Sequence, residues 1–342
     1  MQQRLQDVMI MRPLAIVLMI VWHSFIVYVG GWREPGGYED ITAYWWIAKF
    51  SYAFMLELFV FVSGYVFAIT LNKEGVTFKG VIISKFKRLI VPSLIFSTLY
   101  FVLLGDKSGS VFKVMYDIVN GYGHFWFLPM LFWSTLFCYV LDRVQLSKWI
   151  KVAIVLCLPA LSILPIPLRI GVSFYYIPFF YAGIMVYRHR QRVIDCITDK
   201  QIWLSGLAFG LMFLLKCNTD ELVSIFTQNS DSLIVKGGVI EVKLYVRFLA
   251  AIAGSAFIYI ITNYFVERRC MSIPVWLQDF NQYCFGVYVF QQFILQILYY
   301  KTTLPGLVGP YWLPWIGFVI ALIFSYALSK SIRYFRVGRA IL

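Results

Sequence analysis

Long apolar runs alternate with short polar segments along the whole chain. The first run, VMIMRPLAIVLMIVWHSFIVYV, reaches the ~20 residues that a helix needs to cross a bilayer. Ten such runs cover residues 8–29, 45–71, 89–104, 125–141, 152–166, 172–187, 202–215, 244–265, 285–300 and 312–328. Strict apolar and polar alternation, typical of a membrane barrel, is absent from the sequence, and lipid then favours helices. The pattern predicts an all-α polytopic membrane protein with about ten transmembrane helices, in a single domain over residues 1–342.

Composition supports this fold class. Of the 342 residues, 61% are hydrophobic and 14% are charged, whereas soluble domains carry about 25% charged residues. This leaves too little polar surface for two soluble domains. It also argues against a secreted disulfide scaffold, a nucleic-acid module or a disordered tail.

The formal net charge of +13 has a topological explanation. Lys and Arg lie in short clusters between the apolar runs, without the continuous basic stripe of a nucleic-acid protein. If the N-terminus is inside, the cytoplasmic segments hold 20 of the 30 basic residues, as the positive-inside rule requires. We therefore expect both termini in the cytoplasm, the lipid bilayer as a partner, and no nucleic acid.

The longest external segment is expected from about residue 216 to residue 243. It contains several acidic residues and is polar enough for a binding loop or a lid. A plain connection between two spans fits the same residues.

Among the ionisable residues within the predicted spans, four stand out, namely Arg12, His23, Glu57 and Arg247. Such residues are costly in a membrane and usually face a cavity or a partner. Arg12 and His23 are eleven residues apart, so on a helix they share one face about 16 Å apart along the axis. The sequence therefore places a polar stripe between the cytoplasmic end and a buried histidine.

Each of these residues also has a simpler interpretation. Arg12 fits a snorkelling anchor at the helix end, and Arg247 fits an interfacial anchor. His23 fits a hydrogen-bonded packing residue. Glu57 is harder to explain, because a carboxylate at midspan needs a partner or must be neutral. Taken together, the four residues favour a functional polar cavity.

The spacing of Arg12 and His23, with ten residues between them, resembles the first-span signature of the acyltransferase-3 family of membrane acyltransferases. The resemblance continues, in the same order, over nearly the whole chain. Its further elements are ELFVFVSGY at 57–65, KFKRLIVP at 85–92, HFWFL at 124–128, FFYAG at 179–183 and CFGVYVFQ at 284–291. One departure is Gln291, which stands where many members have histidine. The catalytic role is therefore assigned to His23.

This resemblance implies ten core helices that move an acyl group, usually acetyl, from cytoplasmic acyl-CoA to a carbohydrate. The implied acceptor is a glycan of the cell envelope, and the implied location is the bacterial cytoplasmic membrane. The donor substrate would be acetyl-CoA or another acyl-CoA. No metal is expected.

Acyl transfer to a hydroxyl needs a base, a group that stabilises the oxyanion, and a dock for the anionic donor. His23 is the candidate base, because histidine exchanges protons near neutral pH. Glu57 is the candidate to orient its imidazole. The candidates for the phosphates of the donor are Arg12, Lys85, Lys87 and Arg88, although the last three also fit the topological charge pattern.

The candidates for acceptor contact are His124, Trp126, Arg247 and Ser63. His124 and Trp126 fall at the outer end of a span, where aromatic rings stack on sugars or form the interfacial belt. Ser63 could carry a covalent acyl group, but it lacks a GxSxG setting and a Ser-Gly pair is typical of helix packing.

A transporter that exports a glycan or a lipid without bond chemistry is the alternative function. It would share the intramembrane charges, and many transporters contain internal repeats, which this sequence lacks. A transporter also has no need of a cytoplasmic CoA dock. Thioester-dependent acyl incorporation separates the two functions.

Overall fold

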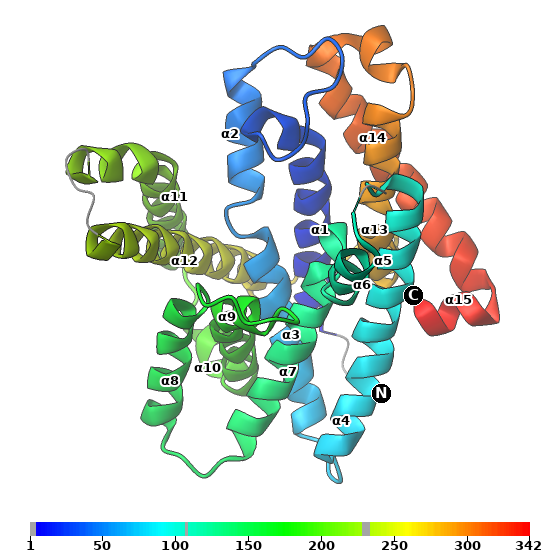
Figure 1. Cartoon of the computed structure of the whole chain (residues 1–342). Helices are drawn as coiled ribbons and strands as arrows, with labels where there is room; N and C mark the ends of the chain where they lie inside the picture. Colours follow the sequence, from blue (N-terminus) through cyan, green and yellow to red (C-terminus); the bar gives the residue numbers. More distant parts are fainter. Residues whose placement is uncertain (1–4, 107–108, 228–232) are drawn as a thin grey trace.

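The computed structural model describes residues 5–106, 109–227 and 233–342, and within these ranges it contains helices and no strands (Figure 1). The α-helices are α1 (Val8–Phe25), α2 (Thr42–Ser51), α3 (Met55–Leu71), α4 (Phe78–Lys85), α5 (Val91–Leu104), α6 (Val111–Val119), α7 (Phe127–Arg143), α8 (Lys148–Leu161), α9 (Ile170–Arg188), α10 (Arg190–Asp195), α11 (Asp199–Thr227), α12 (Leu233–Asn263), α13 (Val275–Tyr300), α14 (Leu304–Tyr334) and α15 (Arg336–Ile341). The 3₁₀ turns are η1 (Ile26–Val29) and η3 (Gly123–Trp126), and the π-helical turns are η2 (Phe86–Ile90) and η4 (Tyr264–Arg268). The all-α prediction is confirmed.

Eight helical segments of the described chain are long and apolar enough to cross a membrane, and they match eight of the ten predicted spans. The other two predicted spans fall in α8 and α13. Helix α8 has only 14 residues, which is too short to cross a bilayer without help. Helix α13 is long, with 26 residues, but its glutamines lower its mean hydropathy.

The expected polar connection at 216–243 is mostly helix. Helix α11 continues to Thr227 and α12 begins at Leu233, while residues 228–232 lie outside the described part of the chain. The two helices project together from the body of the molecule (Figure 1). No proline interrupts either helix, so each continues beyond the apolar stretch that hydropathy detects.

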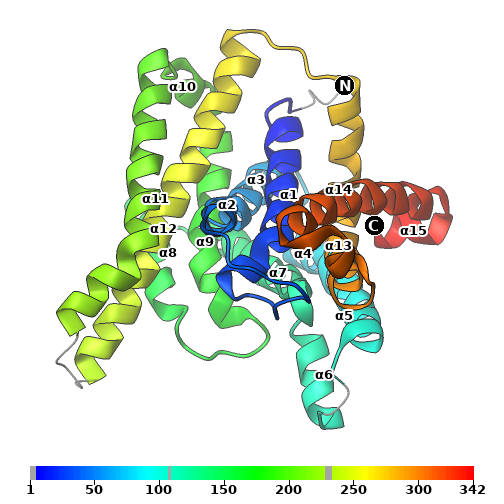
Figure 2. The ribbon, with the colours of Figure 1, turned by 90° about the horizontal axis from the view of Figure 1, so that it is seen from above.

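Helix α1 lies in the middle of the bundle when the molecule is seen from above (Figure 2). It packs against α3 on one side and against α13 and α14 on another, and α3 in turn packs on α9. This central position surrounds the side chains of α1 with protein, as a polar stripe within a membrane requires.

Two glycines allow α3 and α9 to cross in close contact. A Cβ added to Gly64 would lie 2.0 Å from the carbonyl oxygen of Phe180, and one added to Gly183 would lie 2.1 Å from that of Phe61. Small residues permit this approach between membrane helices. Any larger residue would push the two backbones apart.

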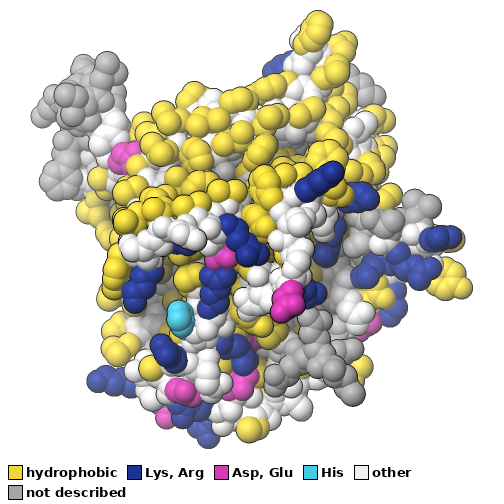
Figure 3. Space-filling view, turned by 90° about the horizontal axis from the view of Figure 1, so that it is seen from below, with side chains coloured by type: hydrophobic (Ala, Val, Ile, Leu, Met, Phe, Trp, Pro, Cys, Tyr) yellow, Lys and Arg dark blue, Asp and Glu magenta, His cyan; other side chains and the backbone are white. Residues whose placement is uncertain are grey.

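Basic side chains gather on the face seen from below, whereas hydrophobic side chains dominate elsewhere in that view (Figure 3). The α3–α4 and α7–α8 connections lie at this lower end in Figure 1. Both connections were predicted to be cytoplasmic. The sidedness itself stays a prediction, and the charge distribution fits it.

Candidate functional site

A cavity of about 610 Å³ opens between α1, α3, α13 and the C-terminal segment. We call it the basic cavity, because its lining includes five basic residues, Arg12, Lys85, Arg88, Arg333 and Arg339. In the described part of the chain no carboxylate forms an ion pair with any of them. The cavity therefore concentrates positive charge that no ion pair among the described residues compensates, and such a site attracts anions.

A π-helical turn places Lys85 and Arg88 at this cavity. In η2 the N–H of Val91 donates to the carbonyl of Phe86, five residues earlier. Pro92, two residues after the turn, has no N–H to give to the carbonyl of Arg88. Single π turns inside helices occur frequently at functional sites.

Three of the four predicted donor-binding residues line the basic cavity. Lys87, the fourth, is exposed and does not belong to the lining. The lining also includes Arg333 and Arg339, which are not among the site residues predicted from the sequence. No local motif marks them, because their place depends on how the tail folds back against α13.

Ser63 also lines the basic cavity. Its hydroxyl donates to the carbonyl of Phe59 at 2.9 Å, inside the same helix. A second cavity of about 480 Å³ adjoins the basic cavity and shares Arg12, Val66 and Thr70 with it.

His23 is buried, with 8% of its surface exposed. Its ring stacks on Trp32 with 5.8 Å between centroids, and the ring of His124 meets it edge-on at 6.2 Å. The side-chain amide of Gln291 lies beside the His23 imidazole. The structure therefore brings His23 and His124 together, from helices that lie a hundred residues apart in sequence.

Several polar atoms at this histidine pair are buried without a hydrogen-bond partner among the described residues. They are Nδ1 of His23, Nδ1 of His124, and both polar atoms of the Gln291 amide. By contrast, Nε2 of His124 lies 3.1 Å from the carbonyl of Tyr288, whose hydroxyl donates back to the His124 carbonyl at 2.8 Å. Buried polar atoms normally have partners, so orphans at one place indicate a binding position.

Two helices lead from the basic cavity to the histidine pair. Arg12 and His23 share one face of α1, as predicted, about 16 Å apart along the axis. On α13, Cys284 lines the basic cavity and Gln291 lies two turns farther on, on the same face. The predicted polar stripe thus has a matching stripe on the neighbouring helix.

A separate pocket of about 330 Å³ lies near the predicted outer ends of the spans. We call it the outer pocket, and its lining consists of Tyr52, Trp126, Ser162, Arg169, Val172, Tyr175, Tyr176, Leu244 and Arg247. Trp126 and Arg247, both predicted to contact the acceptor, line it. His124 does not, because it is buried beside His23.

The structure gives Glu57 a different partner from the predicted one. Its Oε1 lies 3.3 Å from Nη2 of Arg247, and no hydrogen bond joins it to His23 within the described chain. The same Nη2 lies 3.2 Å from the hydroxyl of Tyr176. The sequence could not show this pairing, because 190 residues separate Glu57 from Arg247.

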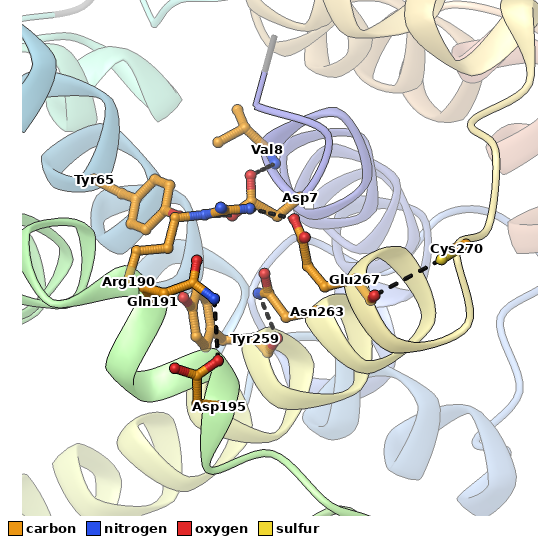
Figure 4. A network of polar contacts seen from close by, with 10 residues as sticks. All are labelled: Asp7, Val8, Tyr65, Arg190, Gln191, Asp195, Tyr259, Asn263, Glu267 and Cys270. Atoms are coloured by element: carbon orange, nitrogen blue, oxygen red, sulfur yellow. Dashed lines mark hydrogen bonds and ion pairs between the residues drawn. The ribbon is translucent and has the colours of Figure 1, made fainter. Parts of the chain in front are cut away.

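A polar network fixes the start of α1 (Figure 4). Asp7 caps the helix by accepting from the N–H of Val8 at 2.9 Å, and the hydroxyl of Tyr65 donates to Asp7 at 2.7 Å. Arg190 donates to Tyr65 at 2.8 Å and pairs with Glu267 at 2.5 Å. Burial acts to lower the pKa of Arg190, but Tyr65, Asp7 and Glu267 raise that pKa above its ordinary value. This network, which sequence reasoning missed, holds the helix that carries Arg12.

Within the described ranges, no three His, Cys, Asp or Glu side chains converge as metal ligands do. No curated protein and no solved structure matches the chain. The model of the acyltransferase-3 family, described as an acyltransferase domain, matches residues 6–333. That match includes α1, the basic cavity as far as Arg333, the histidine pair and the outer pocket, so the chain belongs to the acyltransferase-3 family of membrane acyltransferases.

Proposed function

We propose that this membrane acyltransferase moves an acyl group, most simply acetyl, from cytoplasmic acyl-CoA to a hydroxyl of a cell-envelope carbohydrate. The bacterial cytoplasmic membrane is its proposed location. The observation that carries the proposal is the basic cavity, whose uncompensated cations lie at one end of the stripe that leads to His23.

The chemistry of the donor suits the basic cavity. Acyl-CoA has several phosphate groups at one end and a thioester at the other, joined by a long flexible arm. Arginine and lysine bind phosphates through charge-assisted hydrogen bonds. We place the phosphates at Arg12, Lys85 and Arg88, with the arm directed along α1 and α13 towards the histidine pair.

His23 is the proposed general base. Its imidazole takes the proton of the acceptor hydroxyl, and the oxygen attacks the thioester carbonyl to give a tetrahedral oxyanion. The intermediate collapses, the carbon–sulfur bond breaks, and the CoA thiolate leaves and takes up the proton from His23. The side-chain amide of Gln291 lies beside His23, and we assign its N–H as the donor to the oxyanion.

Glu57 and Arg247 belong to the acceptor side in this proposal. Their pairing at the outer pocket argues for a role in acceptor binding and not for support of the His23 imidazole. Trp126, in the lining of the same pocket, offers a ring for a sugar face.

The test is transfer of radiolabel from [acetyl]-CoA in inside-out membrane vesicles. Native protein is compared with His23→Ala and Arg12→Ala at matched expression, and Lys87→Ala is the control, because Lys87 does not line the basic cavity. We expect acceptor-linked label with native protein and Lys87→Ala, and its loss in the other two variants.

Unchanged label in His23→Ala would reject the general base while leaving the acyltransferase assignment intact. Absence of label with native protein, repeated with succinyl-CoA and native envelope glycans, would favour export without bond chemistry.

A further inference from the structure

The outer pocket carries more positive charge than its one ion pair explains. Arg247 is paired with Glu57, but Arg169 also lines the pocket, and Lys216 lies next to it over the ring of Tyr52. Neither Arg169 nor Lys216 forms an ion pair in the described part of the chain. Asp117 lies near Arg169 and Glu57 near Lys216, but neither carboxylate pairs directly with the cation, so each cation keeps hydrogen-bonding capacity for a ligand.

Lys216 is the more unusual of the two. Its Nζ is buried and has no hydrogen-bond partner among the described residues. The ammonium lies 5.6 Å from the centroid of Tyr52, and the guanidinium of Arg247 lies 5.4 Å from the same ring. A buried ammonium without a hydrogen-bond acceptor is costly, and the nearby Glu57 carboxylate is engaged by Arg247, so a second anion, supplied by a ligand, would satisfy it.

Arg169 is held at the pocket by an uncommon backbone. Leu168 and Arg169 are consecutive non-glycine residues with φ of 57° and 61°. This left-handed region costs free energy for residues with a Cβ, and such strain concentrates at binding sites. Nε of Arg169 donates to the carbonyl of Asn120 at 2.9 Å, which fixes the arginine, and no hydrogen bond to its terminal nitrogens occurs among the described residues.

Aromatic rings complete the pocket. Tyr52, Trp126, Tyr175 and Tyr176 all belong to its lining, and Arg247 lies 4.7 Å above the ring of Tyr175. Flat rings suit the apolar face of a sugar, whereas fixed cations suit a carboxylate or a phosphate. A ligand that satisfies both is an acidic sugar.

The outer pocket is also tied to the histidine pair. Tyr52 stacks on Trp22 with 4.2 Å between centroids, and Trp22 precedes His23 in α1. Trp126 follows His124 by two residues, at the junction of η3 and α7. The same short segments therefore form the pocket and the site of the proposed chemistry.

We infer that the acceptor is an anionic glycan, and that Arg169, Lys216 and Arg247 in and beside the outer pocket bind a carboxylate or phosphate of one of its sugars. The inference that the bound glycan is an acyl acceptor rests on the proposed function. The anion-binding site itself does not depend on acyl transfer.

The experiment measures binding to the purified full chain by calorimetry at fixed ionic strength, with no acyl donor present. The probes are p-nitrophenyl glucuronide and glucose 6-phosphate, and the neutral reference is p-nitrophenyl glucoside. We expect at least one anionic probe to bind about tenfold or more tightly than the glucoside. The two probes distinguish a carboxylate from a phosphate.

Variants separate this pocket from the basic cavity. Arg169→Gln and Lys216→Met should remove the preference for the anionic probe, whereas Arg88→Gln, which alters the basic cavity, should retain it. Heat unfolding of each variant checks that it is folded.

Equal binding of charged and neutral probes, or no binding of either, would overturn the inference, as would loss of the preference only in Arg88→Gln. Labelled acyl transfer to a neutral glycan would overturn it while leaving the proposed function in place. A preference that depends on Arg169 in a protein without transferase activity would support the pocket and reject the proposed function.

Discussion

Nε of Arg190 lies 3.5 Å from Oδ2 of Asp7, although 183 residues separate them in the sequence. The carboxylate is fully buried, with 0% exposure. Because Asp7 also caps α1, this contact ties the beginning of the central helix to α10. The position of Arg12, five residues farther on, depends on it.

Replacing Arg190 with alanine should destabilise the protein by roughly 2 kcal/mol or more, because it leaves the Asp7 carboxylate buried with less compensation. Heat unfolding in detergent measures the change. Arg188→Ala is a matched control, since its ion pair with Asp142 is more exposed, at 30% and 14%, and should be worth about 1 kcal/mol or less. Equal losses of unfolding free energy in the two variants would show that the buried Asp7 contact contributes no more than an exposed ion pair.

The pair of Glu57 and Arg247 should behave as a unit. Glu57→Gln leaves the Arg247 guanidinium without its carboxylate and should cost about 3 kcal/mol. The double variant Glu57→Gln with Arg247→Met should recover most of that loss, because neither member of the pair is then left as an unpaired charge. A double-mutant cycle of unfolding free energies checks this, and additive losses would contradict the pairing.

The basic cavity should govern donor affinity. Arg88→Ala should raise the KM for acyl-CoA about tenfold and change kcat little, because a phosphate contact remote from the reacting carbon stabilises substrate and transition state alike. The neighbouring Lys87→Ala should leave KM unchanged, since Lys87 does not line the cavity. Steady-state kinetics in proteoliposomes measure both variants, and equal effects would attribute the loss to general surface charge.

The histidine pair yields a prediction about the base. His23→Ala should lower kcat about 10²- to 10⁴-fold, the usual contribution of a general base. Gln291→His should retain transfer, because the resemblance to the acyltransferase-3 family implies that many members carry histidine there. Single-turnover rates measure both variants, and an active His23→Ala would transfer the role of base to another group.

Hydropathy was enough to predict the helical fold and most of the spans, because the bilayer dictates both length and apolarity. Helical periodicity was also enough to place Arg12 and His23 on one face. The partners of these residues were not predictable, since Glu57 meets Arg247 and Arg190 meets Asp7 only through packing between distant helices. Arg333 and Arg339 carry charge but no motif, so the folded tail alone brings them to the basic cavity.

A glycine at the crossing of α3 and α9 should tolerate substitution far less well than a glycine with open space around it. Gly64→Val should prevent stable folding, because even a Cβ at this position would overlap the Phe180 carbonyl. Gly210→Ala on α11 should be neutral or slightly stabilising, since a Cβ there meets nothing within 4 Å and alanine favours helix. Yield of folded protein in detergent compares the two.

The crossing of α3 and α9 also fixes the distance between the two proposed substrate sites. Ser63, next to Gly64, lines the basic cavity, and Glu57 lies six residues earlier, at the pair with Arg247. Six residues of one helix span about 9 Å, and the locked crossing prevents α3 from sliding along α9. The spacing between the donor side and the acceptor side is therefore determined by the rigid helix α3 and not by flexible loops.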